Sequence, residues 1–439
     1  MPMLAESYEI EDNGAKITFY LRQGVKFHNG KEMTAEDVVA SMTRWQKFGA
    51  QASDLGNSTW EALDPYTVVL NVEKPSLSIM YTLANTMQTS SIMPKEVIDE
   101  ADDTGVKEYI GTGPFKLEKW EYDSYIHLTK FEDYQPLDEP ASGLAGRKEA
   151  LVDEIYFYFV PDDSTRLNAM LNGEYHYCYE LPLDSYDQLI QAEGLVVDQY
   201  AFGFQAAMIN KKGLFGDLRY RQALNYAMDN KELLSLAFGN EDFFELTPAY
   251  MRKEQVDWYT EAGKENYNVT DREKARELLE EAGYNGEVVT ILAATDYSYH
   301  YNAAIYTQQV LQEIGMNVEI DATDWATLVS KRADPELWDI FHTFWTTNAT
   351  PLQYPFLYSK ANYPGWTDNP EIDRLYEEIQ NAETQEIGTQ KWEELQALIW
   401  EDLPLINIGL VYFISTYSED LEGYVEHMGP IFWNVSINQ

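Results

Sequence analysis

The sequence predicts an α/β protein, and three observations support that class. Between residues 271 and 345, helical and strand patterns alternate in a β-α-β-α-β run, which is typical of an open, largely parallel sheet with helices on its faces. The first third of the chain is instead dominated by short extended segments separated by turns. Hydrophobic residues make up 45% of the 439 residues, enough to bury a sizeable core.

The first strong pattern lies between residues 19 and 45. Its apolar residues recur at mostly even spacing and predict a pair of strands: Phe19, Leu21, Val25 and Phe27. The dipeptides Gln23-Gly24 and Asn29-Gly30 predict turns, because Gly and Asn tolerate positive φ at little cost. Thr34 is expected to cap a following helix, with Glu36 and Asp37 in its first turn. The buried face of that helix would be formed by Val38, Val39, Met42 and Trp45.

Further elements follow in order along the first half. Residues 60–73 predict a turn at Asp64-Pro65 and then a strand, and Pro94 is expected to open a short helix toward Ile98. Residues 110–128 predict two strands around a turn. A strand at 152–160, a short helix ending before Gly173, a strand at 194–210 and a single helix at 215–234 come next.

The second half contains the alternating run. Asp271 caps a helix that Gly283 ends, and strands are expected at 288–294, 316–323 and 338–345, with helices at 302–315 and 325–333 between them. Sheets of this kind bind ligands at the carboxyl ends of their strands. Helices at 369–382 and 389–403 and an apolar strand from 404 complete the pattern.

Composition limits the possible partners. The formal net charge is −43, and a field of that sign repels phosphate backbones, so we expect no nucleic-acid partner. Acidic residues spread over the surface keep a protein soluble, so the negative charge does not require a cationic ligand. Cys178 is the only cysteine, which excludes an intrachain disulfide. No apolar run of about 18 residues predicts a membrane span.

Two sequence blocks resemble a known family. The first is LR-x-GVKFH-x-G-x-x-x-TA-x-DV-x-x-S at residues 21–41, and the second is F-x-D-x-R-x-RQAL-x-YA-x-D at residues 215–229. Both resemble the large bacterial extracytoplasmic solute-binding proteins of ABC importers, the peptide and nickel type called family 5. The resemblance runs from about Leu4 to Tyr417.

The resemblance implies a two-lobed periplasmic-binding-protein-like fold of type II, in the large cluster, with a small extra β-rich subdomain. It implies residues 1–111 as the small second subdomain, 112–207 as the first lobe, 208–408 as the second lobe with the parallel sheet, and 409–439 as a return to the first lobe. Ligand would enter a cleft between the lobes and favour a closed form that docks on a membrane permease.

The resemblance also implies an extracytoplasmic location, in the periplasm or lipid-anchored at the cell surface. The N-terminus, MPMLAESYEIEDNG, has neither the basic region nor the apolar core of a signal peptide, and taken alone it predicts a cytoplasmic chain. We therefore expect that an N-terminal piece of the first lobe is missing. A remaining sheet edge should then be exposed and the chain marginally stable.

The predicted ligand site follows the apolar strand at 338–345. Family members carry a W-x-x-D segment here, whose carboxylate pairs with a peptide's α-ammonium group, and the matching positions are Trp345, Thr346, Thr347 and Asn348. An amide cannot supply that charge-assisted hydrogen bond, worth roughly 1.5 to 3 kcal/mol, so peptides with a free N-terminus are put in doubt. Trp366 and Phe204 are further candidates, although core packing explains an isolated aromatic as well.

Chemistry other than binding finds little support. His176, Cys178 and Glu180 alternate and would share one side of a strand, but no second cluster completes a metal shell, and no metal or cofactor is expected. No G-x-S-x-G elbow or H-E-x-x-H motif occurs. We expect a monomeric binding protein for an oligopeptide or similar solute, working with permease and ATPase subunits. An oligosaccharide ligand, a glycoside hydrolase and a chaperone-like scaffold are the alternatives.

Overall fold

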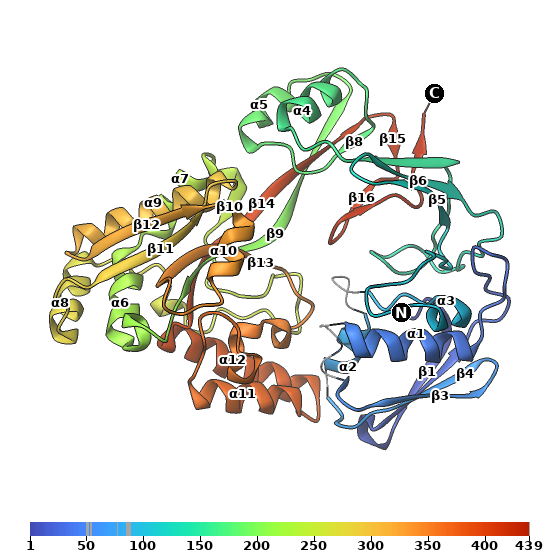
Figure 1. Cartoon of the computed structure of the whole chain (residues 1–439), viewed down its shortest axis with the longest axis horizontal. Coiled ribbons are helices and arrows are strands. Elements are labelled where there is room, and N and C mark those ends of the chain that lie inside the picture. Colours follow the sequence, from blue (N-terminus) through green and yellow to red (C-terminus); the bar gives the residue numbers. More distant parts are fainter. Residues whose placement is uncertain (50–51, 53–54, 77, 85–88, 439) are drawn as a thin grey trace. The chain divides into compact units, whose positions relative to one another are not determined.

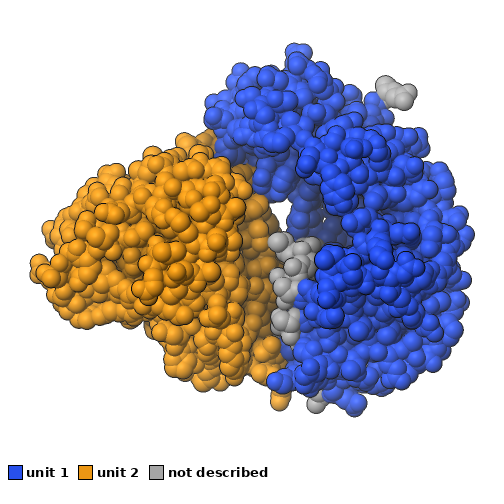
Figure 2. Space-filling model, in the orientation of Figure 1, with its two compact units in different colours: residues 1–200, 414–439 blue, residues 201–413 orange. Residues whose placement is uncertain are grey.

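The computed structural model describes residues 1–439 except 50–51, 53–54, 77, 85–88 and 439. The chain forms two compact units (Figure 2). Unit 1 contains residues 1–200 and 414–439, and unit 2 contains residues 201–413. The second lobe was expected at 208–408, and the finer division of the first unit near residue 111 stays a prediction.

Unit 1 begins with a four-stranded antiparallel sheet (Figure 1). In spatial order its strands are β1 (Ala5–Glu11), β2 (Lys16–Leu21), β4 (Thr67–Asn71) and β3 (Thr59–Asp64). The predicted strand pair at 19–27 is therefore only partly right. The first half forms β2, whereas residues 25–27 make no ladder because the chain turns tightly there, with Phe27 N–H donating to Lys31 O at 2.8 Å. Strand β3 was missed as the partner of β4 across the Asp64-Pro65 turn.

The helix predicted after Thr34 is confirmed as α1 (Ala35–Phe48). The Thr34 side chain and the Asp37 carboxylate form a reciprocal capping box, which satisfies N–H groups that the helix leaves free. Val38 and Met42 are buried against Phe27 and Val68, while Trp45 packs at the margin of the same core. The short helices α2 (Ser78–Leu83) and α3 (Lys95–Asp99) follow, and α3 confirms the helix expected after Pro94.

A second sheet in unit 1 has three antiparallel strands, in the order β5 (Phe115–Glu121), β6 (Tyr125–Lys130) and β7 (Glu154–Tyr158). Helices α4 (Asp163–Leu171) and α5 (Tyr186–Leu189) lie on either side of the two-residue strand β8 (Tyr177–Cys178) in sequence. Two small hairpin-like ladders end the chain, β15 (Leu421–Glu422) with β18 (Ser436–Ile437) and β16 (Val425–Glu426) with β17 (Pro430–Ile431).

Unit 2 is built on a mixed sheet in which the predicted parallel run is confirmed. The strand order is β10 (Phe244–Glu245), β14 (Leu405–Ser418), β9 (Leu195–Ile209), β13 (Ile340–Thr346), β11 (Val288–Ala294) and β12 (Asn317–Thr323). Strand β11 is parallel to β12 and β13, whereas β13 is antiparallel to β9. The chain passes between the units twice, within β9 and within β14.

Helices surround the strands of unit 2 in Figure 1. They are α6 (Leu218–Ala227), α7 (Asn230–Phe238), α8 (Arg272–Ala282), α9 (Ser298–Glu313), α10 (Trp325–Lys331), α11 (Pro370–Gln380) and α12 (Gln385–Asp402). Helices α9 and α10 pack directly on the parallel strands. Helices α8 and α11 begin at their predicted caps, whereas α9 and α12 begin at Ser298 and Gln385, before the predicted 302 and 389. The Asp271 carboxylate accepts from Lys274 N–H, and Gly283 ends α8 in the left-handed region at φ 81°.

The single helix predicted at 215–234 is wrong, because the chain breaks it into α6 and α7. Met228 is extended at φ −83° and ψ 140°, and the Asp229 carboxylate accepts from the N–H groups of Lys231 and Glu232 to start a new helix. The apolar spacing continues across the break, so periodicity alone does not reveal it.

Candidate functional site

The candidate site lies at the carboxyl end of β13. Because β11, β12 and β13 run parallel, their carboxyl ends meet at one edge of the sheet, where such sheets bind ligands. Strand β13 is buried over its first four residues and becomes partly exposed at Phe344. It therefore delivers Trp345 and Thr346 to this edge, and Thr347 and Asn348 continue directly from it.

Trp345 is held by a cluster of aromatic rings. Its ring centroid lies 4.9 Å from that of Phe356, 5.2 Å from that of Tyr363 and 6.0 Å from that of Tyr354. Its indole Nε1–H points to Met208 Sδ at 3.3 Å. These contacts fix the orientation of the indole while leaving part of it exposed, which suits a rigid stacking surface.

The backbone after Trp345 is also fixed. Tyr354 Oη–H donates to Thr346 O at 3.3 Å, and Gln255 Nε2–H donates to Asn348 O at 2.6 Å. The Asn348 side chain is half-buried, and within the described part of the chain its amide group has no hydrogen-bond partner. Its donor and acceptor atoms are therefore available to a ligand.

A small cavity of about 50 Å³ adjoins this segment, entirely within unit 2. It is lined by Gly203, Phe204, Glu245, Thr247, Ala249, Tyr250, Met251, Arg252, Lys253, Glu254, Tyr259, Thr347, Leu410 and Tyr412. The cavity thus combines aromatic walls with four charged side chains and reaches the predicted segment at Thr347.

The charged groups of this cavity form two pairs. The Arg252 guanidinium Nε lies 3.1 Å from a Glu254 carboxylate oxygen, and Lys253 pairs with Glu245, which also accepts from Tyr412 Oη–H at 3.3 Å. The hydrogen bond that Lys253 donates to the Glu245 carboxylate raises the pKa of Lys253, so this ammonium stays charged at neutral pH. Arg252 N–H donates to Gln255 Oε1 at 2.9 Å, which ties the basic residues to the amide that holds Asn348.

The buried phenols next to the cavity stay neutral, and only the hydroxyl of Tyr354 is seen to donate a hydrogen bond, whereas that of Tyr250 has no partner in the described part of the chain. Burial raises the pKa of Tyr250 and of Tyr354, so neither hydroxyl ionises at neutral pH. The cavity's fixed charges therefore come from the Glu245 and Arg252 pairs alone.

The structure brings some predicted site residues together and separates others. Phe204 pairs directly with Trp345 across β9 and β13, and it packs against Tyr354 and Tyr250, yet only 3% of it is exposed. It supports the site from the core. Trp366 instead packs on Trp338 at 5.8 Å, beyond the opposite end of β13, with Lys212 Nζ 4.5 Å from its ring centroid. It does not join the Trp345 cluster.

Sequence reasoning missed the charged residues of the cavity. Glu245 and Arg252 lie on or next to the irregular segment between β10 and α8, which only tertiary contacts bring to the end of β13. No local signal in the sequence indicates them, since basic pairs like Arg252-Lys253 also occur at Arg147-Lys148, Lys211-Lys212 and Lys331-Arg332.

The predicted strand face of His176, Cys178 and Glu180 does not form. The strand contains only Tyr177–Cys178, and Glu180 turns into the left-handed region at φ 49°, which breaks the alternation. Cys178 is buried, and burial raises its thiol pKa. Across the described residues no group of three or more His, Cys, Asp or Glu side chains is placed to hold a metal ion.

Comparison with known proteins identifies the family. The model of bacterial extracellular solute-binding proteins, family 5 (middle part), matches residues 1–367. The chain belongs to this family. The family is described as one of extracellular solute-binding proteins. In the described part of the chain, no helix is both long enough and apolar enough to span a bilayer.

Similar proteins bind several kinds of solute. A probable peptide ABC transporter periplasmic-binding protein, y4tO of Sinorhizobium fredii, is 29% identical over 99% of this chain and 85% of its own length. The glutathione-binding protein GsiB of Salmonella typhimurium is 27% identical over 96% of this chain and 83% of its own. The solved structure of AgaA from A. tumefaciens R10 with agropinic acid has a TM-score of 0.82, 25% identity, and coverage of 100% of this chain and 90% of AgaA. The two-lobed α/β fold is that of these proteins.

Proposed function

We propose that this family 5 protein is the solute-binding component of an ABC importer, and that it captures an oligopeptide or a similar small solute at the carboxyl edge of the unit 2 sheet. The carrying observation is the cluster around Trp345, where a partly exposed indole, an unpaired amide on Asn348 and a charged cavity adjoin one another. The peptide and glutathione names of its relatives support the ligand class.

The chemistry of the cluster favours particular ligand groups. Arg252 offers a planar guanidinium that is only partly screened by Glu254, and such a group suits a ligand carboxylate. Asn348 is neutral and offers an amide, which suits a hydroxyl or amide better than an ammonium group. We therefore infer a solute with a carboxylate whose amino end is absent, blocked or recognised elsewhere.

A saccharide is the second candidate. The neutral Asn348 next to the exposed face of Trp345 would suit a polyhydroxylated ring that stacks on the indole. The agropinic acid bound to AgaA, a relative with the same fold, is a reason to keep ligands other than peptides in the panel.

We also propose that the protein acts as a monomer and delivers its solute to the permease and ATPase subunits of the importer. Affinity near 1 μM, about −8 kcal/mol, would suffice for capture. The protein is expected to bind without turnover. Reporter glycosides test the glycoside hydrolase alternative. Hydrolysis by every independent preparation of the purified protein would favour that alternative, even if variants of the Trp345 cluster still hydrolyse the glycosides.

A thermal-shift and calorimetry panel tests the ligand class. It contains one tetrapeptide, its N-acetylated form, its C-terminal amide and a tetrasaccharide of similar size. We expect the N-acetylated peptide to bind at least as well as the free peptide and the C-terminal amide to bind more weakly. A panel in which only the tetrasaccharide binds would replace the peptide by the saccharide proposal.

Two variants locate the binding site. Asn348→Asp should strengthen binding of the free tetrapeptide by roughly tenfold or more, because a carboxylate gains a charge-assisted bond to the ammonium of about 1.5 to 3 kcal/mol, and it should leave the N-acetylated peptide unchanged. Arg252→Met should weaken every ligand that carries a carboxylate. The matched control is Arg276→Met on α8, which contacts Glu313 and lies outside the cavity lining. Equal affinities for all three variants would contradict the assigned site.

A further inference from the structure

The chain contains four Asn-Gly pairs, and their surroundings differ. They are Asn13-Gly14, Asn29-Gly30, Asn172-Gly173 and Asn285-Gly286. Asn followed by Gly is the dipeptide in which a side-chain amide reacts most readily with the main chain, because Gly has no side chain that shields its nitrogen and bends freely. The side chain of Asn13 lies outside the described part of the structure, so three pairs can be compared.

The reaction joins the Gly nitrogen to the Asn side chain. That nitrogen attacks Cγ of the Asn, the Cγ–Nδ2 bond breaks, and the amide leaves as ammonia, taking the proton of the Gly N–H. Water then opens the five-membered imide. Opening at the former side-chain carbonyl gives Asp, and opening at the main-chain carbonyl gives isoaspartate, whose main chain runs through Cβ and is longer by one methylene. The Gly N–H and the Asn amide must therefore both be free of other partners.

Asn29-Gly30 fails both requirements. The pair lies in a tight turn, in which Gly30 N–H donates to Phe27 O at 2.8 Å. The side chain of Asn29 is also engaged, because its Oδ1 accepts from Lys31 N–H at 3.1 Å. Attack would require both hydrogen bonds to break first, so the folded structure protects this pair.

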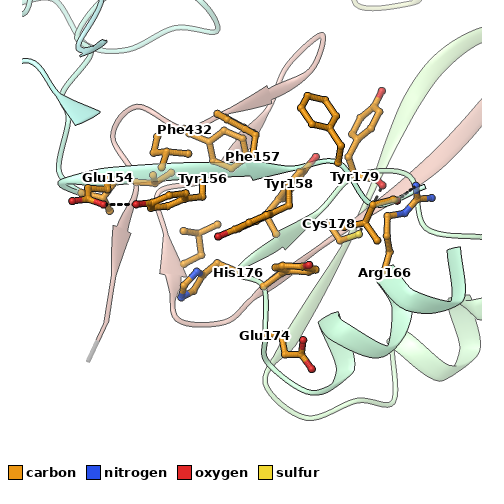
Figure 3. Close-up of a pocket in the computed structure, with 18 of the residues that line it drawn as sticks. Glu154, Tyr156, Phe157, Tyr158, Arg166, Glu174, His176, Cys178, Tyr179 and Phe432 are labelled. Carbon is orange, nitrogen blue, oxygen red and sulfur yellow. Dashed lines mark hydrogen bonds between the residues drawn. The ribbon is translucent and has the colours of Figure 1, made fainter. Parts of the chain in front are cut away.

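Asn172-Gly173 fails the first requirement. The pair ends α4, where Gly173 N–H donates to Met170 O at 3.1 Å and Asn172 keeps nearly helical angles, φ −88° and ψ −2°. It directly precedes Glu174, which lines a hollow of about 700 Å³ in unit 1 (Figure 3). Asn29, Asn172 and Asn285 are all exposed, so access to water does not separate the three pairs.

Asn285-Gly286 meets both requirements. The pair lies in the loop between α8 and β11 (Figure 1). Among the described residues, neither the Gly286 N–H nor the side-chain amide of Asn285 has a hydrogen-bond partner. Gly286 adopts φ 89°, and a side-chain carbon placed on it would have no atom within 4 Å. The loop therefore has room for the imide ring.

The main chain is fixed on both sides of this pair. The Tyr284 hydroxyl accepts from Asn317 N–H, the first residue of β12, at 2.7 Å and donates to Glu287 O at 2.5 Å. Asn285 N–H donates to the Glu287 carboxylate at 2.9 Å, and this hydrogen bond lowers the pKa of Glu287, which is therefore ionised at neutral pH. An added methylene would strain these contacts, and a new carboxylate would be repelled by Glu287.

We propose that Asn285 is a deamidation site of the folded protein, where the Gly286 nitrogen attacks the side chain and water yields Asp and isoaspartate, and that this modification loosens the start of β12. The reaction consumes water and releases ammonia, and no other reactant is needed. The loop lies at the amino ends of the parallel strands β11 and β12, whereas the candidate ligand site lies at their carboxyl edge. The proposal therefore does not depend on which solute the protein binds.

Peptide mass spectrometry of the incubated protein tests the site. Residues 1–439 are kept at about pH 8 in water enriched in ¹⁸O, so that a deamidation during the incubation adds about 3 Da and an earlier one about 1 Da. We expect the Asn285 peptide to gain this mass roughly tenfold faster than the Asn29 and Asn172 peptides, because only its Gly N–H is free, and to separate into two products of equal mass. In urea-unfolded protein the three rates should become similar. Asn29 or Asn172 reacting as fast as Asn285 in the folded protein, or Asn285 reacting only after unfolding, overturns the proposal.

Matched variants connect the reaction to its consequence. Asn285→Gln keeps an amide but would need a six-membered ring, so the mass gain should disappear, whereas Asn172→Gln should leave the Asn285 rate unchanged. After incubation, the amide of Asn317 should exchange with solvent several-fold faster in the wild-type protein than in Asn285→Gln. Before incubation the two proteins should exchange alike. Equal exchange after complete modification would show that the modification does not loosen β12, and that part of the proposal would be wrong.

Discussion

The two units differ in how their β-strands are covered. In unit 2 the parallel strands are covered by helices, and the site at their carboxyl ends is a cavity of only about 50 Å³ with charged and aromatic walls. In unit 1 a hollow of about 700 Å³ runs between two open strand edges, with its rings exposed. Strand ends present side chains and can discriminate small solutes, whereas strand edges present backbone and favour another strand. The two hollows therefore differ in the chemical groups that they present.

The largest expected effect comes from breaking the buried ion cluster of unit 2. Asp402, the last residue of α12, lies 2.8 Å from Lys211 Nζ and 3.4 Å from Arg221, and the side chains of both cations are only 3% exposed. Asp402→Ala leaves both cations buried with fewer partners, and although Asp368 still pairs with Lys211 at 2.7 Å, we expect a loss of about 3 kcal/mol in the free energy of unfolding. Hydrogen exchange under increasing urea, followed peptide by peptide, should assign that loss to unit 2.

The matched control removes an exposed carboxylate. Asp103 pairs with Lys47 at 3.4 Å, and both side chains are well exposed, so Asp103→Ala should leave the stability of either unit unchanged. A loss spread equally over unit 1 and unit 2 after Asp402→Ala would mean that the units do not unfold separately. The two units would then share one free energy of unfolding, and their stabilities could not be compared.

How much of this the sequence predicts depends on the range of the interactions. The caps Asp271, Gly283 and Thr34 were predicted, because such signals depend on residues at most three or four positions apart. The reciprocal contact of Asp37 with Thr34 was not predicted. The break between α6 and α7 was not, because both halves have helical spacing and only the Asp229 side chain decides for a new start. A capping residue was therefore recognisable only where the apolar spacing also stops beside it.

The residues of the candidate site also differ in whether the sequence indicates them. Trp345 to Asn348 could be proposed as a site because they lie at the end of an apolar strand in a parallel run, and the structure places them at the end of β13. Arg252 was missed because it reaches the site through a loop, by way of the Gln255 contact to Asn348. Trp366 was grouped with Trp345 on aromatic character alone, and the distance along β13 separates them. Nothing in residue order specifies which loop returns to which end of a strand.

Acid should weaken unit 2 more than unit 1, because burial lowers the pKa of two histidines in unit 2 and of His28 in unit 1. Burial lowers the pKa of His342 from 6.5 to about 3 and also lowers that of His300, which packs on Phe344. Both are neutral when folded and protonate when unfolded, so the unfolded state binds more protons below pH about 6.5 and stability falls as the pH falls toward 3. Each histidine contributes at most about 1.4 kcal/mol per pH unit. Urea unfolding between pH 7 and pH 5 measures the slope.

The control for this slope is His176→Gln, since His176 is exposed in unit 1. It should leave the pH dependence unchanged, whereas His300→Gln should reduce the slope of unit 2. If the wild-type protein is equally stable at pH 7 and pH 5, with no change in the exchange of unit 2 amides, the two histidines do not remain neutral in the folded state.

The smallest effect concerns the capping box of α1 in unit 1. Thr34→Ala removes the side-chain oxygen that accepts a hydrogen bond from the backbone N–H of Asp37. The free energy of unfolding should fall by about 1 kcal/mol, well below the loss expected for Asp402→Ala. Thr34→Ser keeps the hydroxyl and should restore most of it. Because α1 packs on the sheet formed by β1 to β4, the loss should appear in amides of α1 and β4 and leave those of β7 unchanged. A change that reached β7 would show that the two sheets of unit 1 unfold as one body.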